Sequence, residues 1–122
     1  NQEKKINELI IGMSRDAQFG PLIMIGSGGI YANFLKDVAF ALSYKFTRED
    51  AMEMLQKTRI FSLLQGVRGE SPSDIEAILD VLLKLSQLVN EFPEIMELDI
   101  NPLLSFTKSY SAVDIKITIS RK

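Results

Sequence analysis

The sequence predicts an α+β fold, with a largely antiparallel sheet covered on one face by two main helices. Three observations lead to this prediction. Apolar runs of strand length occupy both ends of the chain, two segments with helical periodicity lie between them, and the connections at both ends are short enough for hairpins. The expected element order is β-β-β-α-α-β-β, in a single domain over residues 1–122.

The N-terminal part is expected to form three strands. Residues 5–14 and 22–25 are apolar runs, separated by a turn at 15–21 that contains Gly and Pro. These two strands are close enough in sequence to pair as an antiparallel hairpin. A flexible glycine loop at 26–29 follows, and a third strand is expected over about 36–45.

The first predicted helix covers about 48–57. Thr47 is a favourable N-cap, and acidic side chains in the first turn complement the helix dipole. The following segment, 58–70, is expected to be mostly a connector because it contains two glycines. The helix is expected to bury Ala51, Met54 and Leu55.

The second predicted helix begins at a capping box formed by Ser73 and Glu76 and ends before Pro93. Apolar residues recur through it at helical spacing. We expect this stripe to pack across the sheet as core, and a partner-docking face is the alternative. The stripe consists of Ile75, Ile78, Leu79, Leu82, Leu85, Leu88, Val89 and Phe92.

The C-terminal part is expected to form a hairpin with a polar face. Residues 97–103 and 113–119 both alternate apolar and polar side chains, with a break or bulge at Pro102. Asp99, Asn101 and Asp114 would converge on one face of such a hairpin. Their oxygens are hard ligands of the kind that Mg²⁺ takes, and a solvated polar face without a ligand is the alternative.

Composition excludes several classes of function. The formal net charge is −2, so no basic surface indicates a nucleic-acid partner. The chain has no histidine, which excludes an imidazole triad or His-ligated zinc from this chain alone. It also has no cysteine, as expected for a cytoplasmic protein. No apolar run reaches the roughly 20 residues that span a bilayer, so no membrane partner is expected.

The glycine loop does not match the common phosphate-binding motifs. Gly29 is followed by Ile30 and Tyr31, whereas a Walker A loop ends in Gly-Lys-Ser/Thr and the dinucleotide fingerprint has glycine in the sixth position. A glycine run after a strand can still direct backbone N–H groups at an anion. A tight loop without a ligand is the alternative.

Five motifs, in order along nearly the whole chain, resemble one family. They are FGPLIMIGSGGIY at 19–31, LKDVAF at 35–40, LLQGVRGE at 63–70, FPEI at 92–95 and ELDINPL at 97–103. Together they resemble the ATP-grasp domain of the ADP-forming (NDP-forming) acyl-CoA synthetases, relatives of the succinyl-CoA synthetase β subunit. The last motif, followed by an Asp on the next strand, is the most specific.

The resemblance implies a fold and a site. An ATP-grasp domain holds ATP between two α+β lobes, and this chain resembles the C-terminal lobe, with the N-terminal lobe absent. The resemblance implies that Asn101 and Asp114 hold Mg²⁺ on the phosphates of ATP or ADP, with Asp99 as a neighbouring acidic position. It also implies that Gly28 and Gly29 let the backbone approach the phosphates or an incoming histidine loop.

The resemblance further implies a reaction and a partner. The family converts an acid, CoA and ATP reversibly to acyl-CoA, ADP and phosphate, through an acyl phosphate and a phosphohistidine. Because this chain has no histidine, a histidine-bearing CoA-ligase domain or subunit must supply it, in a hetero- or homo-oligomer. We therefore expect the 122 residues alone to be inactive. Acid specificity in the family lies largely in other domains.

Two departures from the family pattern support a second hypothesis. Asn33 stands where members often have Glu, and Ala41 where they often have Arg. Both departures remove charges that could steer or neutralise phosphate. The alternative function is thus a non-catalytic regulatory or interaction module that keeps the shape of the lobe.

Overall fold

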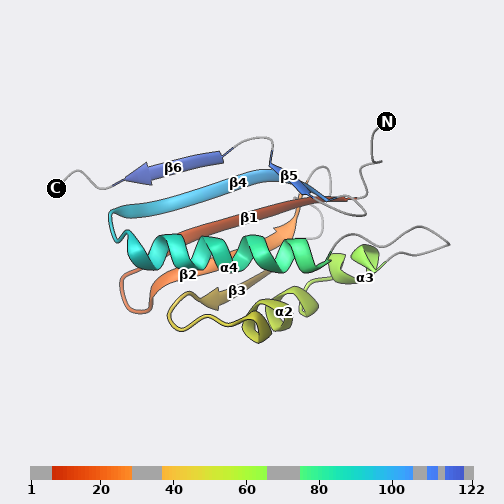
Figure 1. Ribbon diagram of the computed structural model, residues 1–122, viewed down its shortest axis with the longest axis horizontal. Helices are drawn as coiled ribbons and strands as arrows, with labels where there is room; N and C mark the ends of the chain where they lie inside the picture. Colours follow the sequence, from red (N-terminus) through yellow and green to blue (C-terminus); the bar gives the residue numbers. More distant parts are fainter. Residues whose placement is uncertain (1–6, 29–36, 66–74, 106–109, 113–114, 120–122) are drawn as a thin grey trace.

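The computed structural model describes residues 7–28, 37–65, 75–105, 110–112 and 115–119 (Figure 1). Strands occupy both ends of this chain, and helices lie between them. The elements are β1 (Asn7–Asp16), β2 (Gly20–Ser27), β3 (Val38–Leu42), α2 (Arg48–Gln56), α3 (Ile60–Leu64), α4 (Ile75–Glu91), β4 (Ile95–Ser105), β5 (Tyr110–Ala112) and β6 (Ile115–Ile119).

The strands form one antiparallel sheet. Its order is β3-β2-β1-β4-β5, and β6 also pairs with β4. The α+β fold and both predicted hairpins are therefore confirmed. The second strand of the C-terminal hairpin is described as two pieces, β5 and β6, and residues 106–109, which connect β4 to β5, lie outside the described residues.

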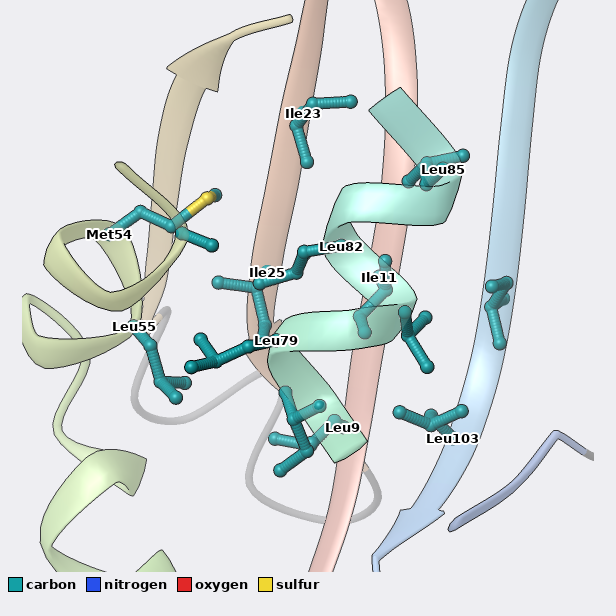
Figure 2. Close-up of a cluster of buried hydrophobic side chains, with 14 of the residues drawn as sticks. Leu9, Ile11, Ile23, Ile25, Met54, Leu55, Leu79, Leu82, Leu85 and Leu103 are labelled. Atoms are coloured by element: carbon teal, nitrogen blue, oxygen red, sulfur yellow. The ribbon is translucent and has the colours of Figure 1, made fainter. Parts of the chain in front are cut away.

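The helices cover one face of the sheet, with α4 over β1 and β2 and α2 beside β3 (Figure 1). Alternate residues of β1 and β2 point into this layer, because strand side chains alternate between faces. Figure 2 shows the resulting core, in which side chains of α4 and α2 meet those of the sheet: Leu9, Ile11, Ile23, Ile25, Met54, Leu55, Leu79, Leu82, Leu85 and Leu103.

The predicted packing of α4 across the sheet is confirmed, with differences at its C-terminal end. Leu88 and Phe92 belong to the apolar stripe but are 37% and 47% exposed. Val81 and Ser86 lie outside the stripe and are buried. The helix ends before Pro93 as predicted, whereas the capping residue Ser73 lies outside the described residues.

The prediction for α2 is confirmed in detail. The Thr47 side chain accepts a hydrogen bond from the backbone N–H of Asp50, and the Asp50 side chain accepts one from the backbone N–H of Thr47. This reciprocal pair is a capping box. The expected residues are buried: Ala51, Met54 and Leu55.

Three predicted boundaries are wrong. The third strand is shorter than predicted, because it covers Val38–Leu42 rather than about 36–45 and the chain turns at 44–45. Gly26 belongs to β2 rather than to a loop, and it pairs with Ile10 and Val38. A Cβ at Gly26 would lie 2.7 Å from the Asp37 carbonyl oxygen, so the glycine permits close approach of two strands. The first turn is also shorter than predicted, because β1 continues to Asp16 before the turn at 17–19.

The predicted connector at 58–70 contains a short helix, α3. The first backbone N–H groups of α3 donate hydrogen bonds to a side chain that is distant in sequence. The Asp37 carboxylate accepts hydrogen bonds from the backbone N–H groups of Arg59 and Ile60, at 2.6 and 2.8 Å. This capping contact explains how a five-residue helix forms here. Within the part of the chain that is described, no helix is long and apolar enough to cross a membrane.

Candidate functional site

Asp99 lies in the middle of β4, on the face of the sheet opposite the helices, which we call the open face. Its neighbours Leu98 and Ile100 are buried on the helix-covered face. Asp99 pairs with Gly12 of β1 on one side and with Lys116 of β6 on the other. Its side chain is half-buried.

A hollow of about 340 Å³ surrounds Asp99 on the open face. Residues from five strands line it, and they include both polar and apolar side chains. The polar ones can contact charged groups, and Met24 and Phe40 offer apolar contact to a flat ring. The lining residues are Gly12, Met13, Ser14, Met24, Phe40, Glu97, Leu98, Asp99 and Thr118.

The Asp99 carboxylate leans over Gly12. A Cβ built at Gly12 would lie 3.5 Å from Asp99 Oδ1 and 3.0 Å from the Leu98 carbonyl oxygen. Among the described residues, no hydrogen bond or ion pair joins this carboxylate to another side chain or to the backbone. A half-buried carboxylate without a protein partner is suited to a cation or a ligand donor.

Asn101 lies two residues beyond Asp99, at a β-bulge. Leu9 pairs with Leu103 and Ile11 with Ile100, so two residues of β4 oppose one of β1. The bulge coincides with the predicted interruption at Pro102. Asn101 is exposed, and alternation places it on the open face with Asp99.

Asp114, the third predicted metal ligand, lies outside the described residues. Its chain neighbour Ile115 begins β6 and pairs with Ile100, which adjoins Asn101. The structure therefore brings Asp99 and Asn101 to one face, and the position of Asp114 stays a prediction.

Gly28 directly follows β2 and is buried. Its backbone N–H donates a hydrogen bond to the Glu8 carbonyl oxygen at 2.9 Å. A Cβ at this position would lie 3.2 Å from the Glu8 carbonyl carbon, so the close approach made here is to β1. Gly29 lies outside the described residues.

The donor set suits Mg²⁺. Mg²⁺ usually keeps several waters and binds through one or two carboxylates together with substrate phosphates, rather than in an all-protein cage. Asp99 and Asn101 offer oxygen donors on one face, and the described residues contain no cluster of three or more His, Cys, Asp or Glu side chains. A metal bound here would therefore have to take its remaining ligands from water or from a bound phosphate.

Sequence reasoning did not identify Gly12, Ser14 or Thr118 as part of the site. Gly12 carried a usable signal, because a glycine inside an apolar strand marks a bulge or a close approach. Ala41, one of the two family departures, packs against the helix-covered core. A charge at that position would not lie on the open face, so this departure does not weaken the site. Asn33 lies outside the described residues.

The ATP-grasp domain family matches residues 1–119. The chain belongs to this family. Acetate–CoA ligase (ADP-forming) I of Archaeoglobus fulgidus is 45% identical to this ATP-grasp domain over 115 residues, which are 94% of the chain and 17% of the relative. The β subunit of acetate–CoA ligase (ADP-forming) I of Pyrococcus furiosus is 46% identical over 112 residues, which are 92% of the chain and 48% of that subunit.

A solved structure agrees with the fold. The dinucleotide-forming acetyl-coenzyme A synthetase 1 of Ca. Korarchaeum cryptofilum superposes on this ATP-grasp domain with a TM-score of 0.87 at 41% identity. The match covers 94% of this chain and 53% of the synthetase chain. That structure contains coenzyme A and Mg-AMPPCP, and its phosphohistidine segment points towards the nucleotide binding site. The chain thus spans about half or less of the length of these relatives.

Proposed function

We propose that this ATP-grasp domain binds Mg²⁺ and ATP or ADP within an ADP-forming acyl-CoA synthetase. The whole enzyme would convert an acid, CoA and ATP to acyl-CoA, ADP and phosphate, reversibly. The observation that carries this proposal is the half-buried carboxylate of Asp99, which has no hydrogen bond or ion pair with any described residue and lies beside Asn101 on the open face. The relatives named as ADP-forming ligases support the reaction class.

The roles of the residues follow from their chemistry. Asn101 and Asp114 would hold the metal, and Asp99 would complete the donor set or orient a bound water. A metal held by these residues would supply positive charge that offsets the charge of the nucleotide phosphates during phosphoryl transfer. Met24 and Phe40, in the same hollow, would contact the apolar part of the nucleotide.

A second domain or subunit must supply the phosphoryl acceptor, because this chain has no histidine. We propose that a histidine-bearing CoA-ligase segment approaches the open face, within a hetero- or homo-oligomer. The phosphohistidine segment of the Ca. Korarchaeum cryptofilum synthetase points towards its nucleotide binding site, which supports a histidine-bearing segment that reaches the nucleotide.

The test is phosphoryl transfer by the complete enzyme that contains this domain. We expect Asp114→Asn to lower the rate of ATP formation from acyl-CoA, ADP and phosphate by about 100-fold or more, because several kcal/mol of charge stabilisation are lost. The fold should remain, since the change is isosteric.

Asp80→Asn provides the matched control. Asp80 is an exposed carboxylate on α4, on the opposite side of the sheet, where it pairs with Arg48. This variant should keep the wild-type rate. Wild-type activity in Asp114→Asn would show that Asp114 is not a metal ligand. If the complete wild-type enzyme showed no nucleotide-dependent phosphoryl transfer, the proposed function itself would be contradicted.

A further inference from the structure

Asp37 is a buried carboxylate that the proposed site does not use. It directly precedes β3 and is 8% exposed. Three hydrogen bonds reach its two oxygens: from Arg59 N–H to Oδ1 at 2.6 Å, from Ile60 N–H to Oδ2 at 2.8 Å, and from Ser27 Oγ to Oδ2 at 3.0 Å. Burying a carboxylate is unfavourable unless hydrogen-bond donors compensate it, and these three donors do so.

These bonds join two parts of the chain that are far apart in sequence. One part is the start of α3, which Asp37 caps. The other is the end of β2, where Ser27 is held twice, because its backbone N–H also donates to the Asp37 carbonyl oxygen at 3.1 Å. Asp37 therefore fixes the last residue of β2 to the helix layer.

The end of β2 lies in line with the candidate site. Ser27 pairs with Leu9 of β1, and Leu9 pairs with Leu103 of β4, the first residue after the bulge that carries Asn101. The next residue after Ser27 is Gly28, whose N–H is bound to Glu8 of the same strand β1. A displacement of Ser27 would therefore be transmitted through Leu9 of β1 to Leu103 and the bulge of β4.

We propose that Asp37 is a positioning residue for phosphoryl transfer: its carboxylate locks the Ser27–Gly28 end of β2 to α3 and so keeps β1 and the Asn101 bulge in register. This inference rests on the proposed function. A small displacement of reacting groups lowers a rate strongly, whereas loss of an ordinary helix cap lowers only stability. That difference separates a positioning role from a structural one.

The experiment compares kinetics and stability in the complete enzyme. Asp37→Asn keeps the shape but replaces one acceptor oxygen by an NH₂ group, which cannot accept a bond from Ser27 or from the α3 backbone. We expect kcat for ATP formation to fall by about tenfold or more, with the KM for ADP changed by less than about threefold.

Thr47→Ala is the matched control, because it removes the capping side chain of α2 on the same layer. It should lower the unfolding midpoint while leaving kcat and KM unchanged. The inference is overturned if Asp37→Asn, measured at a temperature where it is folded, has the same unchanged kcat and KM as Thr47→Ala.

Ser27→Ala keeps the test decisive if Asp37→Asn does not fold. It removes only the hydroxyl bond and leaves the cap of α3 in place. We expect a severalfold lower kcat, and no further loss when it is combined with Asp37→Asn. An unchanged kcat in Ser27→Ala would contradict the proposal, whereas a wild-type enzyme that transfers no phosphoryl group would contradict the proposed function instead.

Discussion

The side chain of Asp99 lies over Gly12, and this arrangement explains why a glycine occupies the middle of a strand. Gly12 is flanked in space by the Leu98 carbonyl oxygen and by Met24, at 3.0 and 3.6 Å from a built Cβ. Any side chain there would enter the hollow beside the carboxylate. The glycine at position 12 thus keeps the space beside the Asp99 carboxylate open.

Gly12→Ala should weaken nucleotide binding more than it weakens the fold. The added methyl group would lie close to the Leu98 carbonyl oxygen, and this contact should lower the free energy of unfolding by about 1 kcal/mol. We expect the Kd of the complete enzyme for Mg-ADP to rise by about fivefold or more, since the methyl group narrows the hollow next to Asp99. Isothermal titration and chemical denaturation measure the two quantities.

Gln56→Ala is the control for that change, because Gln56 is exposed at the end of α2 and does not line the hollow. Its Kd for Mg-ADP should stay within about twofold of wild type. Equal affinities of Gly12→Ala and wild type would show that the nucleotide does not occupy this part of the open face.

Alternation along β4 was sufficient to predict that Asp99 and Asn101 share a face. It was not sufficient in β3, where every residue is apolar. There the larger side chains of Val38 and Phe40 lie exposed on the open face, and the small Ala39 faces the core. The sequence pattern alone would favour burying the larger side chains. The structure reverses this, because Met54 and Leu55 of the nearby helix α2 are buried in the core on the covered side.

At the scale of elements, α4 is held at its C-terminal end by a side chain from β1. Arg15 donates hydrogen bonds to the carbonyl oxygens of Ile95, Val89 and Phe92, at 2.6, 3.0 and 3.3 Å. The last carbonyl groups of a helix have no partner within the helix, and a cation there also complements the helix dipole. Arg15 thus joins α4, the start of β4 and the hairpin of β1 and β2.

Arg15→Ala should lower the free energy of unfolding by about 2 kcal/mol, because the carbonyl groups of α4 lose a charged donor in a partly buried place. Chemical denaturation of the chain checks this value. Arg48→Ala is the control: Arg48 pairs with Glu76 and Asp80, and its side chain is 45% exposed. Its loss should change stability by less than about 1 kcal/mol. A larger effect from Arg48 than from Arg15 would refute this account of the helix end.

The elements that the sequence predicted well are those stabilised locally. The capping box of α2 lies within four consecutive residues, and α4 combines a long apolar stripe with a proline stop. The helix α3 could not be predicted in the same way. Its capping carboxylate, Asp37, is 22 residues away from Arg59 in sequence, so its formation depends on tertiary contact.

At the scale of the whole molecule, one core cluster joins the sheet to the three helices of the described residues. Leu82 of α4 is fully buried in it, whereas Leu88 on the same helix is 37% exposed. Leu82→Ala should lower the free energy of unfolding by about 2–5 kcal/mol, through lost burial and the cavity that remains. Leu88→Ala should cost about 1 kcal/mol or less. Similar effects of both changes in a denaturation experiment would contradict the single-core description.

The open face has no helix layer among the described residues, and its hollow lies between an apolar margin on β3 and the polar residues of β4. The relatives are at least about twice as long as this chain. We propose that a further lobe closes the nucleotide site over this face, so the 122 residues alone should bind nucleotide weakly and catalyse nothing. Loss of one wall of a site removes part of the contact area that holds a ligand.

The most direct measurement is the effect of Mg²⁺ on ADP affinity in the complete enzyme, determined for wild type and Asn101→Ala, with Gln87→Ala on the exposed side of α4 as control. We expect Mg²⁺ to strengthen ADP binding by about tenfold or more in wild type and in Gln87→Ala, and by less than about twofold in Asn101→Ala. An equal gain from Mg²⁺ in Asn101→Ala and wild type would show that the metal is held elsewhere.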